Sequence, residues 1–113
     1  MESIKQGDVF WVNFDPSVGA EVKKVRPSVV VSNDINNEHF PIISIAPITS
    51  NVTRVYSFEV ELPAGTLNLT SRSKIMVNQT RAVDKVRLVQ FIDSLPAALM
   101  EKVKAALNLH YNL

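Results

Sequence analysis

Short apolar segments separated by turn-forming residues make up most of the chain, a pattern typical of β-strands. Residues 9–14 are apolar on both faces and predict a strand in the centre of a sheet. Residues 56–62 alternate apolar and polar side chains and predict a strand with one face in water. Three further strands are predicted, over residues 27–32, 42–48 and 74–78. Pro47 indicates that the second of these bends or lies at a sheet edge.

The C-terminal part of the chain has a helical period instead. An apolar stripe at helical spacing consists of Leu95, Leu99, Val103, Ala106 and Leu107. Asp93 or Ser94 is expected to cap this helix, with Pro96 in its first turn. Residues 84–88 predict a single helical turn, whereas residues 33–40 are polar and predict turns. The whole pattern predicts a mainly β protein, a small and strongly bent β-barrel with a C-terminal helix over one open side.

Composition limits the classes of function open to this chain. The chain has 113 residues, of which 46% are hydrophobic, so we expect one domain over residues 1–113. Its net charge of +1 argues against bulk binding to polyanions. It contains no cysteine, and His39 and His110 lack the spacing of a metal site. No apolar run is long enough to cross a membrane and no signal peptide is recognisable. We therefore expect a cytoplasmic protein without a metal or cofactor.

An arginine and two hydroxyl side chains lie at the ends of two predicted strands. Arg26 directly precedes one strand, and Thr49 and Ser50 follow the next. If these strands pair, the three side chains share one rim of the barrel. A guanidinium is permanently charged and its forked donors match phosphate oxygens, which hydroxyl groups also bind. The pattern indicates a phosphate site, although a surface ion pair of Arg26 with Glu21 or Asp34 is the commoner use of an isolated arginine.

Other residues near this rim are candidates for contacts with a nucleic acid. Residues 15–25 form a long charged loop that ends beside Arg26, and long loops in small domains are often functional. Basic side chains are scattered, and a subset near the rim, including Lys23, can follow a phosphate backbone. Trp11 and Phe14 are expected in the core, and Phe14, at a strand end, can also stack on a base.

A series of short motifs covers nearly the whole chain: GDVFWVNFDP at residues 7–16, GAE at 19–21, RP at 26–27, VVVSND at 29–34, PITS at 47–50 and QTRAVDKVRL at 79–88. Their order and spacing resemble those of the MazF/PemK (Kid) family of bacterial toxins. The resemblance implies an SH3-like barrel, a homodimer, and metal-independent cleavage of single-stranded mRNA at short sequences, which inhibits translation and growth. Attack by the RNA 2′-hydroxyl would leave 2′,3′-cyclic phosphate and 5′-hydroxyl ends. The resemblance also implies a cognate antitoxin whose C-terminal segment occupies the RNA groove, and operator DNA binding only through that antitoxin.

The resemblance assigns roles to particular residues. By position, Arg26 and Thr49 match the family's catalytic pair. Glu21, Ser50 and Gln79 match positions that line the RNA site. The chemistry of the reaction, considered separately, makes Glu21 the candidate base, or else a residue that orients Arg26. Further candidates for contacts with bases in the groove of the dimer are Phe14, Asn33, Gln79 and Arg81.

Two other interpretations stay open at this point. One is a non-catalytic toxin of the same fold that binds gyrase, as CcdB toxins do through C-terminal residues of their terminal helix. The other is an interaction domain that binds an acidic peptide in a basic groove. The presence of Arg26 together with Thr49 favours the nuclease over both.

Overall fold

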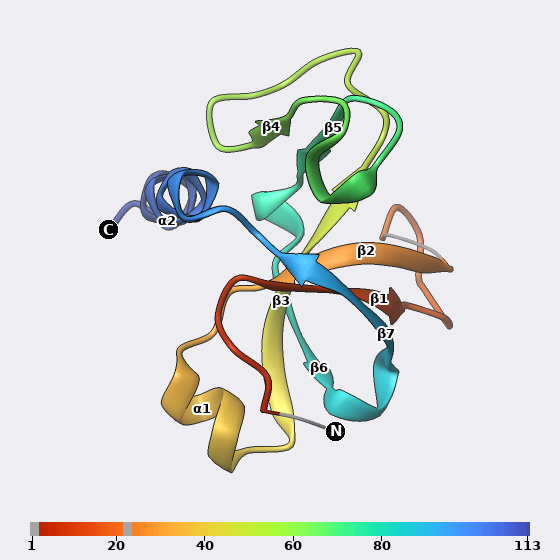
Figure 1. The fold of residues 1–113 in the computed structure, drawn as a ribbon, viewed down its shortest axis with the longest axis vertical. Coiled ribbons are helices and arrows are strands. Elements are labelled where there is room, and N and C mark those ends of the chain that lie inside the picture. The colour runs from red at the N-terminus through yellow and green to blue at the C-terminus, as the bar shows by residue number, and fades with distance from the viewer. Residues whose placement is uncertain (1–2, 22–23) are drawn as a thin grey trace.

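The computed structural model describes residues 3–21 and 24–113 (Figure 1). Within these residues, seven strands form one antiparallel sheet in the order β4-β5-β3-β2-β1-β7, with β6 paired to β3 off this path. The strands are β1 (Asp8–Asn13), β2 (Val25–Val30), β3 (Ile42–Thr49), β4 (Val60–Leu62), β5 (Ser73–Ile75), β6 (Arg81–Asp84) and β7 (Leu88–Ser94). The helices are α1 (Asp34–His39) and α2 (Ala97–Tyr111), and the 3₁₀ turns are η1 (Thr66–Asn68), η2 (Val77–Gln79) and η3 (Lys85–Arg87). The predicted mainly β fold with a C-terminal helix is confirmed.

Strands β1 and β3 are both internal to the sheet. Strand β1 pairs with β2 on one side and β7 on the other, as its two apolar faces predict. Strand β3 pairs with β2, and on its other side with β6 before Pro47 and with β5 after it. Proline has no N–H to donate, so the position between two partners tolerates it. The alternative of an edge strand at Pro47 is therefore wrong.

Several strands differ from the predicted ranges. The alternation over residues 56–62 forms a strand only in β4, because the Glu59 carboxylate accepts the backbone N–H of Tyr56 and holds the preceding residues in a turn. The predicted strand over residues 74–78 divides into β5 and η2. Strands β6 and β7 are not predicted by the pattern, because β6 is short and polar and β7 is mostly exposed. The single turn predicted over residues 84–88 is η3.

The first helix was not predicted, and the second begins differently from the prediction. Residues 33–40 contain α1, because the Asn33 side chain accepts the N–H of Asn36 and caps a helix. Asp93 and Ser94 do not cap α2, since the strand ladder of β7 includes both; Pro96 is the N-cap residue and supplies no side-chain hydrogen bond. None of the helices in the described ranges is long and apolar enough to span a membrane.

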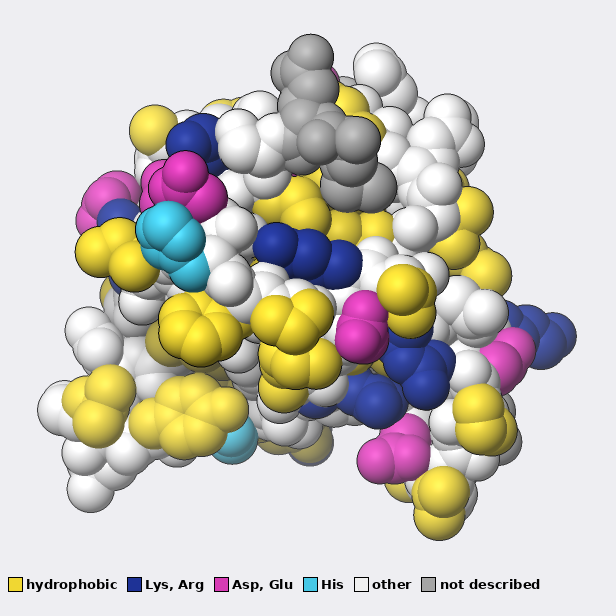
Figure 2. Space-filling model, turned by 90° about the horizontal axis from the view of Figure 1, so that it is seen from below, with side chains coloured by type: hydrophobic (Ala, Val, Ile, Leu, Met, Phe, Trp, Pro, Cys, Tyr) yellow, Lys and Arg dark blue, Asp and Glu magenta, His cyan; other side chains and the backbone are white. Residues whose placement is uncertain are grey.

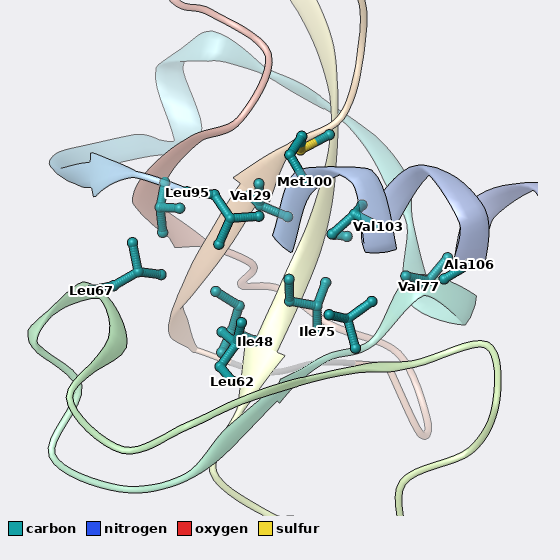
Figure 3. Packing of buried hydrophobic residues seen from close by; sticks show 13 residues of the cluster. Val29, Ile48, Leu62, Leu67, Ile75, Val77, Leu95, Met100, Val103 and Ala106 are labelled. Atoms are coloured by element: carbon teal, nitrogen blue, oxygen red, sulfur yellow. The ribbon is translucent and has the colours of Figure 1, made fainter. Parts of the chain in front are cut away.

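Two buried clusters pack against opposite faces of the central strands. Successive residues show the alternation, since Val29 of β2 belongs to one cluster and Val30 to the other. Figure 3 shows the first cluster, in which side chains from β3, β5 and η2 meet those of α2, among them Ile75 and Val103. The second cluster contains Phe14 and residues of β1, β2, β3 and β6. The central strands are thus held from both sides, which makes them a rigid support for groups at their ends.

The end of the molecule that carries α1 and β6 exposes apolar side chains among charged ones, as the space-filling view from below shows (Figure 2). Ile35, Phe40 and Val86 are all more than half exposed. They contribute little to the core, and substitutions there provide controls for the packed region.

Replacing Ile75 by alanine is expected to lower the free energy of unfolding by about 2–5 kcal/mol, because its side chain is fully buried between the sheet and α2 and its loss leaves a cavity. Val86→Ala is the matched control, because this side chain is exposed, and it should change the free energy of unfolding by no more than about 0.5 kcal/mol. Urea denaturation measures both values. Equal stability of the two variants would contradict the packing in Figure 3.

Candidate functional site

The pairing of β2 with β3 brings Arg26 and Thr49 together. In this antiparallel ladder Ser28 pairs with Pro47. The ladder ends at this pair, and the same register continued by two residues directs Arg26 and Thr49 to the same face of the sheet. Both side chains line the same surface hollow, as this register requires. The shared rim predicted from the sequence is present.

This arginine hollow has a volume of about 190 Å³ and is lined by Trp11, Val25, Arg26, Pro27, Ile48, Thr49, Ser50, Leu69 and Ser73. Arg26 and Ser50 are exposed, and Thr49 is half-buried. Trp11 was expected in the core, but it is 37% exposed and belongs to this wall. Sequence reasoning missed it as a site residue. The sequence holds no signal for its exposure, because residues 9–12 are all apolar and only the structure shows Trp11 exposed between the buried Phe10 and Val12.

A second, larger hollow of about 550 Å³ adjoins the first. This loop hollow is lined by Phe14, Ala20, Glu21, Pro47, Asn78, Gln79, Thr80 and Arg81. The two hollows meet at the C-terminal end of β3, because Pro47 lines the loop hollow while Ile48 and Thr49 line the arginine hollow. Of the predicted site residues that the structure describes, all but Asn33 line one of the two hollows.

Phe14 lies next to the loop hollow, but its side chain is fully buried. The guanidinium carbon of Arg81 lies 5.7 Å from the centroid of its ring, a cation–π arrangement. The predicted place of Phe14 in the core is confirmed. Its suggested stacking on a base is not available in this arrangement, because the ring is fully covered. Phe14 instead orients Arg81, which is half-buried and lies at the hollow's wall.

The loop between β1 and β2 is closed at its base by hydrogen bonds. Phe14 N–H donates to the carbonyl of Lys24 (2.8 Å), and Lys24 N–H donates to the carboxylate of Asp15 (2.9 Å). The Arg87 guanidinium donates to the carbonyls of Asn13 and Asp15, at 3.1 and 2.8 Å. This closure fixes the chain just before Arg26. Residues 22–23, and with them the predicted contact residue Lys23, lie outside the described part of the chain.

Hydrogen bonds define the positions of two further candidates. The Glu21 carboxylate is exposed and accepts the N–H of Val18 (2.8 Å), which holds residues 18–21 in a turn at the wall of the loop hollow. The Thr49 hydroxyl oxygen accepts the N–H of Asn51 (3.2 Å), which ties its side chain to the segment that follows β3. A hydroxyl that accepts one hydrogen bond still has a proton to donate to a ligand oxygen.

Asn33 is not brought to either hollow. It follows the C-terminal end of β2, whereas Arg26 lies near that strand's beginning, and its side chain caps α1. The structure therefore separates it from the other predicted contact residues. Among the described residues, no group of three or more His, Cys, Asp or Glu side chains is placed to hold a metal ion.

Comparison with known proteins identifies the family. The model of the PemK-like, MazF-like toxins of type II toxin–antitoxin systems matches residues 5–111. The chain belongs to this toxin family. It is 36% identical to Endoribonuclease MazF9 of Mycobacterium tuberculosis over 115 residues, which cover 97% of this chain and 98% of that relative. The resemblance inferred from the motifs is thereby confirmed.

Solved structures of family members share the fold. MazF from Deinococcus radiodurans is 26% identical and superposes with a TM-score of 0.86, covering all of both chains. An endoribonuclease from a mycobacterial species in complex with its cognate antitoxin is 19% identical, with a TM-score of 0.81 over 97% of this chain and 96% of that one. The predicted barrel of the MazF/PemK type is confirmed, and at least one protein of this fold binds an antitoxin.

Proposed function

We propose that this toxin-family endoribonuclease cleaves single-stranded mRNA without a metal ion, through Arg26 and Thr49, at short sequences read by the two hollows. The observation that carries the proposal is the placement of Arg26 and Thr49 in one hollow, at the junction with the other. A charged fork and a hydroxyl on neighbouring rigid strands match the non-bridging oxygens of one phosphate. Cleavage of mRNA would stop translation and growth.

The reaction follows from the chemistry of RNA. The 2′-oxygen attacks the adjacent phosphorus, a bond forms between them, and the bond from phosphorus to the 5′-oxygen breaks. One proton leaves the 2′-hydroxyl and one proton reaches the 5′-oxygen, so the products are a 2′,3′-cyclic phosphate and a 5′-hydroxyl. The protein must therefore accept a proton, supply a proton and stabilise the additional negative charge on the transition state.

Arg26 stabilises that charge in this proposal, and Thr49 holds the phosphate through its hydroxyl proton. One donor of this kind is typically worth about 3–4 kcal/mol, or about 10²–10³ in rate. Ser50, which follows Thr49 on the rim, offers a second hydroxyl for a phosphate oxygen. Glu21 lies on the adjoining loop, and two roles fit its position: accepting the 2′-hydroxyl proton, or orienting Arg26.

Bases next to the scissile phosphate are read from the walls of the hollows. Trp11 offers a partly exposed ring beside Arg26, and aromatic rings stack on unpaired bases. Gln79 and Arg81 line the loop hollow, where an amide and a guanidinium can bond base edges or phosphates. The phosphate-binding pair thus stands between two surfaces for base recognition.

The partners proposed for this chain follow from its family and from the shape of the site. A cognate antitoxin would cover the same two hollows with its C-terminal segment, which excludes RNA directly, and would alone bring the complex to operator DNA. A homodimer would set two copies of the rim across one groove. We place the protein in the cytoplasm, where mRNA is available. The gyrase-binding alternative is not favoured, since the relative MazF9 is named an endoribonuclease.

Arg26→Ala is expected to lower the rate of RNA cleavage by about 10²-fold or more, because it removes the charge that stabilises the transition state. Folding should be unaffected, since the side chain is exposed. The measurement is cleavage of a long single-stranded RNA in the presence of EDTA, with the product ends analysed for cyclic phosphate.

Arg72→Ala is the matched control, because Arg72 is another exposed arginine of the sheet region and lies outside both hollows. It should cleave like the unmodified chain. Undiminished cutting by Arg26→Ala, or loss of cutting in EDTA by the unmodified chain, would reject the proposed mechanism.

Trp11→Ala is expected to raise KM about tenfold with little change in kcat, because a stacking surface contributes to binding rather than to the transition state. Trp11 is the chain's single tryptophan, so its fluorescence should also fall when an uncleavable oligonucleotide binds the unmodified chain. Phe91→Ala on β7 removes a comparably exposed aromatic side chain outside the hollows and serves as the control. A KM equal to that of the control would remove Trp11 from the site.

A further inference from the structure

A lysine lies directly beside the proposed phosphate-binding pair. In the ladder between β3 and β5, Thr49 pairs with Lys74. Thr49 therefore lies between Arg26, with which it lines one hollow, and Lys74, with which it is paired, and paired side chains on one face are close enough to influence each other. Lys74 has no role in the cleavage described so far.

The side chain of Lys74 forms an almost buried ion pair. Its Nζ lies 3.0 Å from Oε1 of Glu59, and the two side chains are only 12% and 5% exposed. A second ion pair on the same two neighbouring segments, Arg72 with Glu61, is 57% and 39% exposed. Lys74 and Arg72 are two residues apart, so they lie on the same side of the chain, and they differ chiefly in burial.

The ion pair also fastens the segment that continues from Thr49. Lys74 Nζ donates to the carbonyl of Arg54 (2.7 Å), and Glu59 Oε1 accepts the N–H of Tyr56 (2.9 Å). At the other end of this segment, the Thr49 hydroxyl accepts the N–H of Asn51 (3.2 Å). Residues 50–59 are thus held at one end by the phosphate-binding hydroxyl itself and at the other by the lysine beside it.

We propose that Lys74, through its ion pair with Glu59, is a positioning residue that keeps Thr49 in the geometry required to grip the scissile phosphate. This inference rests on the proposed function. Without the pair, residues 50–59 lose their anchor on β5 and the Thr49 hydroxyl loses its fixed direction. The lysine also neutralises a carboxylate that would otherwise repel a phosphate at the neighbouring rim. Small displacements of a positioned group cost rate rather than binding.

The test compares kcat, KM and melting temperature for single and double variants of the full chain. Lys74→Met keeps the apolar stem and removes the charge, and Glu59→Gln keeps the side-chain length. The double variant Lys74→Met/Glu59→Gln leaves no unpaired buried charge, so it separates a folding defect from a positioning defect. Arg72→Met, which removes the exposed pair, is the matched control. The substrate is an oligonucleotide with one mapped cleavage site.

The expected result is a fall in kcat of about tenfold or more for Lys74→Met, with KM within about twofold of the unmodified chain. The double variant should regain melting temperature but not kcat. Arg72→Met should match the unmodified chain in all three values. An unchanged kcat for Lys74→Met, an equal loss for Arg72→Met, or recovery of kcat together with melting temperature in the double variant would each overturn the inference.

The same experiment distinguishes this failure from failure of the proposed function. If the unmodified chain and Lys74→Met cleave the oligonucleotide equally well, only the role of Lys74 is overturned. An unmodified chain that does not cleave RNA at all overturns the proposed function, and with it the inference.

Discussion

The antiparallel pairing of β2 with β3 is the interaction on which the site depends. The register of this ladder sets the first residues of β2 beside the last residues of β3, so that Arg26 and Thr49 line one hollow. The register is well defined because both faces are buried there: Val29 and Ala46 face one cluster, and Val30 and Ile45 face the other. A slip of one residue would reverse every side chain and bring the wrong face to each cluster. Packing in the core therefore determines where Arg26 and Thr49 lie on the surface.

The strands and the segments that connect them contribute different parts of the candidate site. The groups proposed to bind phosphate lie at strand ends, whereas many of the residues around them come from the loop after β1, the segment after β3 and η2. Each of these connections is tied at its base by specific hydrogen bonds, such as those of Asp15 and Arg87 for the first.

Much of this organisation could be predicted from the sequence, and the failures have physical causes. Apolar runs bounded by turn residues located β1, β2 and β3, and a helical period located α2. Residue chemistry at strand ends, with the family resemblance, located Arg26 and Thr49. Strands β6 and β7 were missed because their partners, not their own patterns, stabilise them. The sequence did not show that Asn33 caps a helix away from both hollows, because residues 33–40 have too few apolar side chains to predict a helix. The exposure of Trp11 depends on tertiary packing.

The most direct measurement is a crystal structure with an oligonucleotide that carries the mapped cleavage site and a 2′-deoxy sugar before the scissile phosphate, so that it cannot react. The account predicts the Arg26 guanidinium and the Thr49 hydroxyl within hydrogen-bond distance of oxygens on that one phosphate. A scissile phosphate bound elsewhere on the surface, with neither side chain in contact with it, would contradict the account.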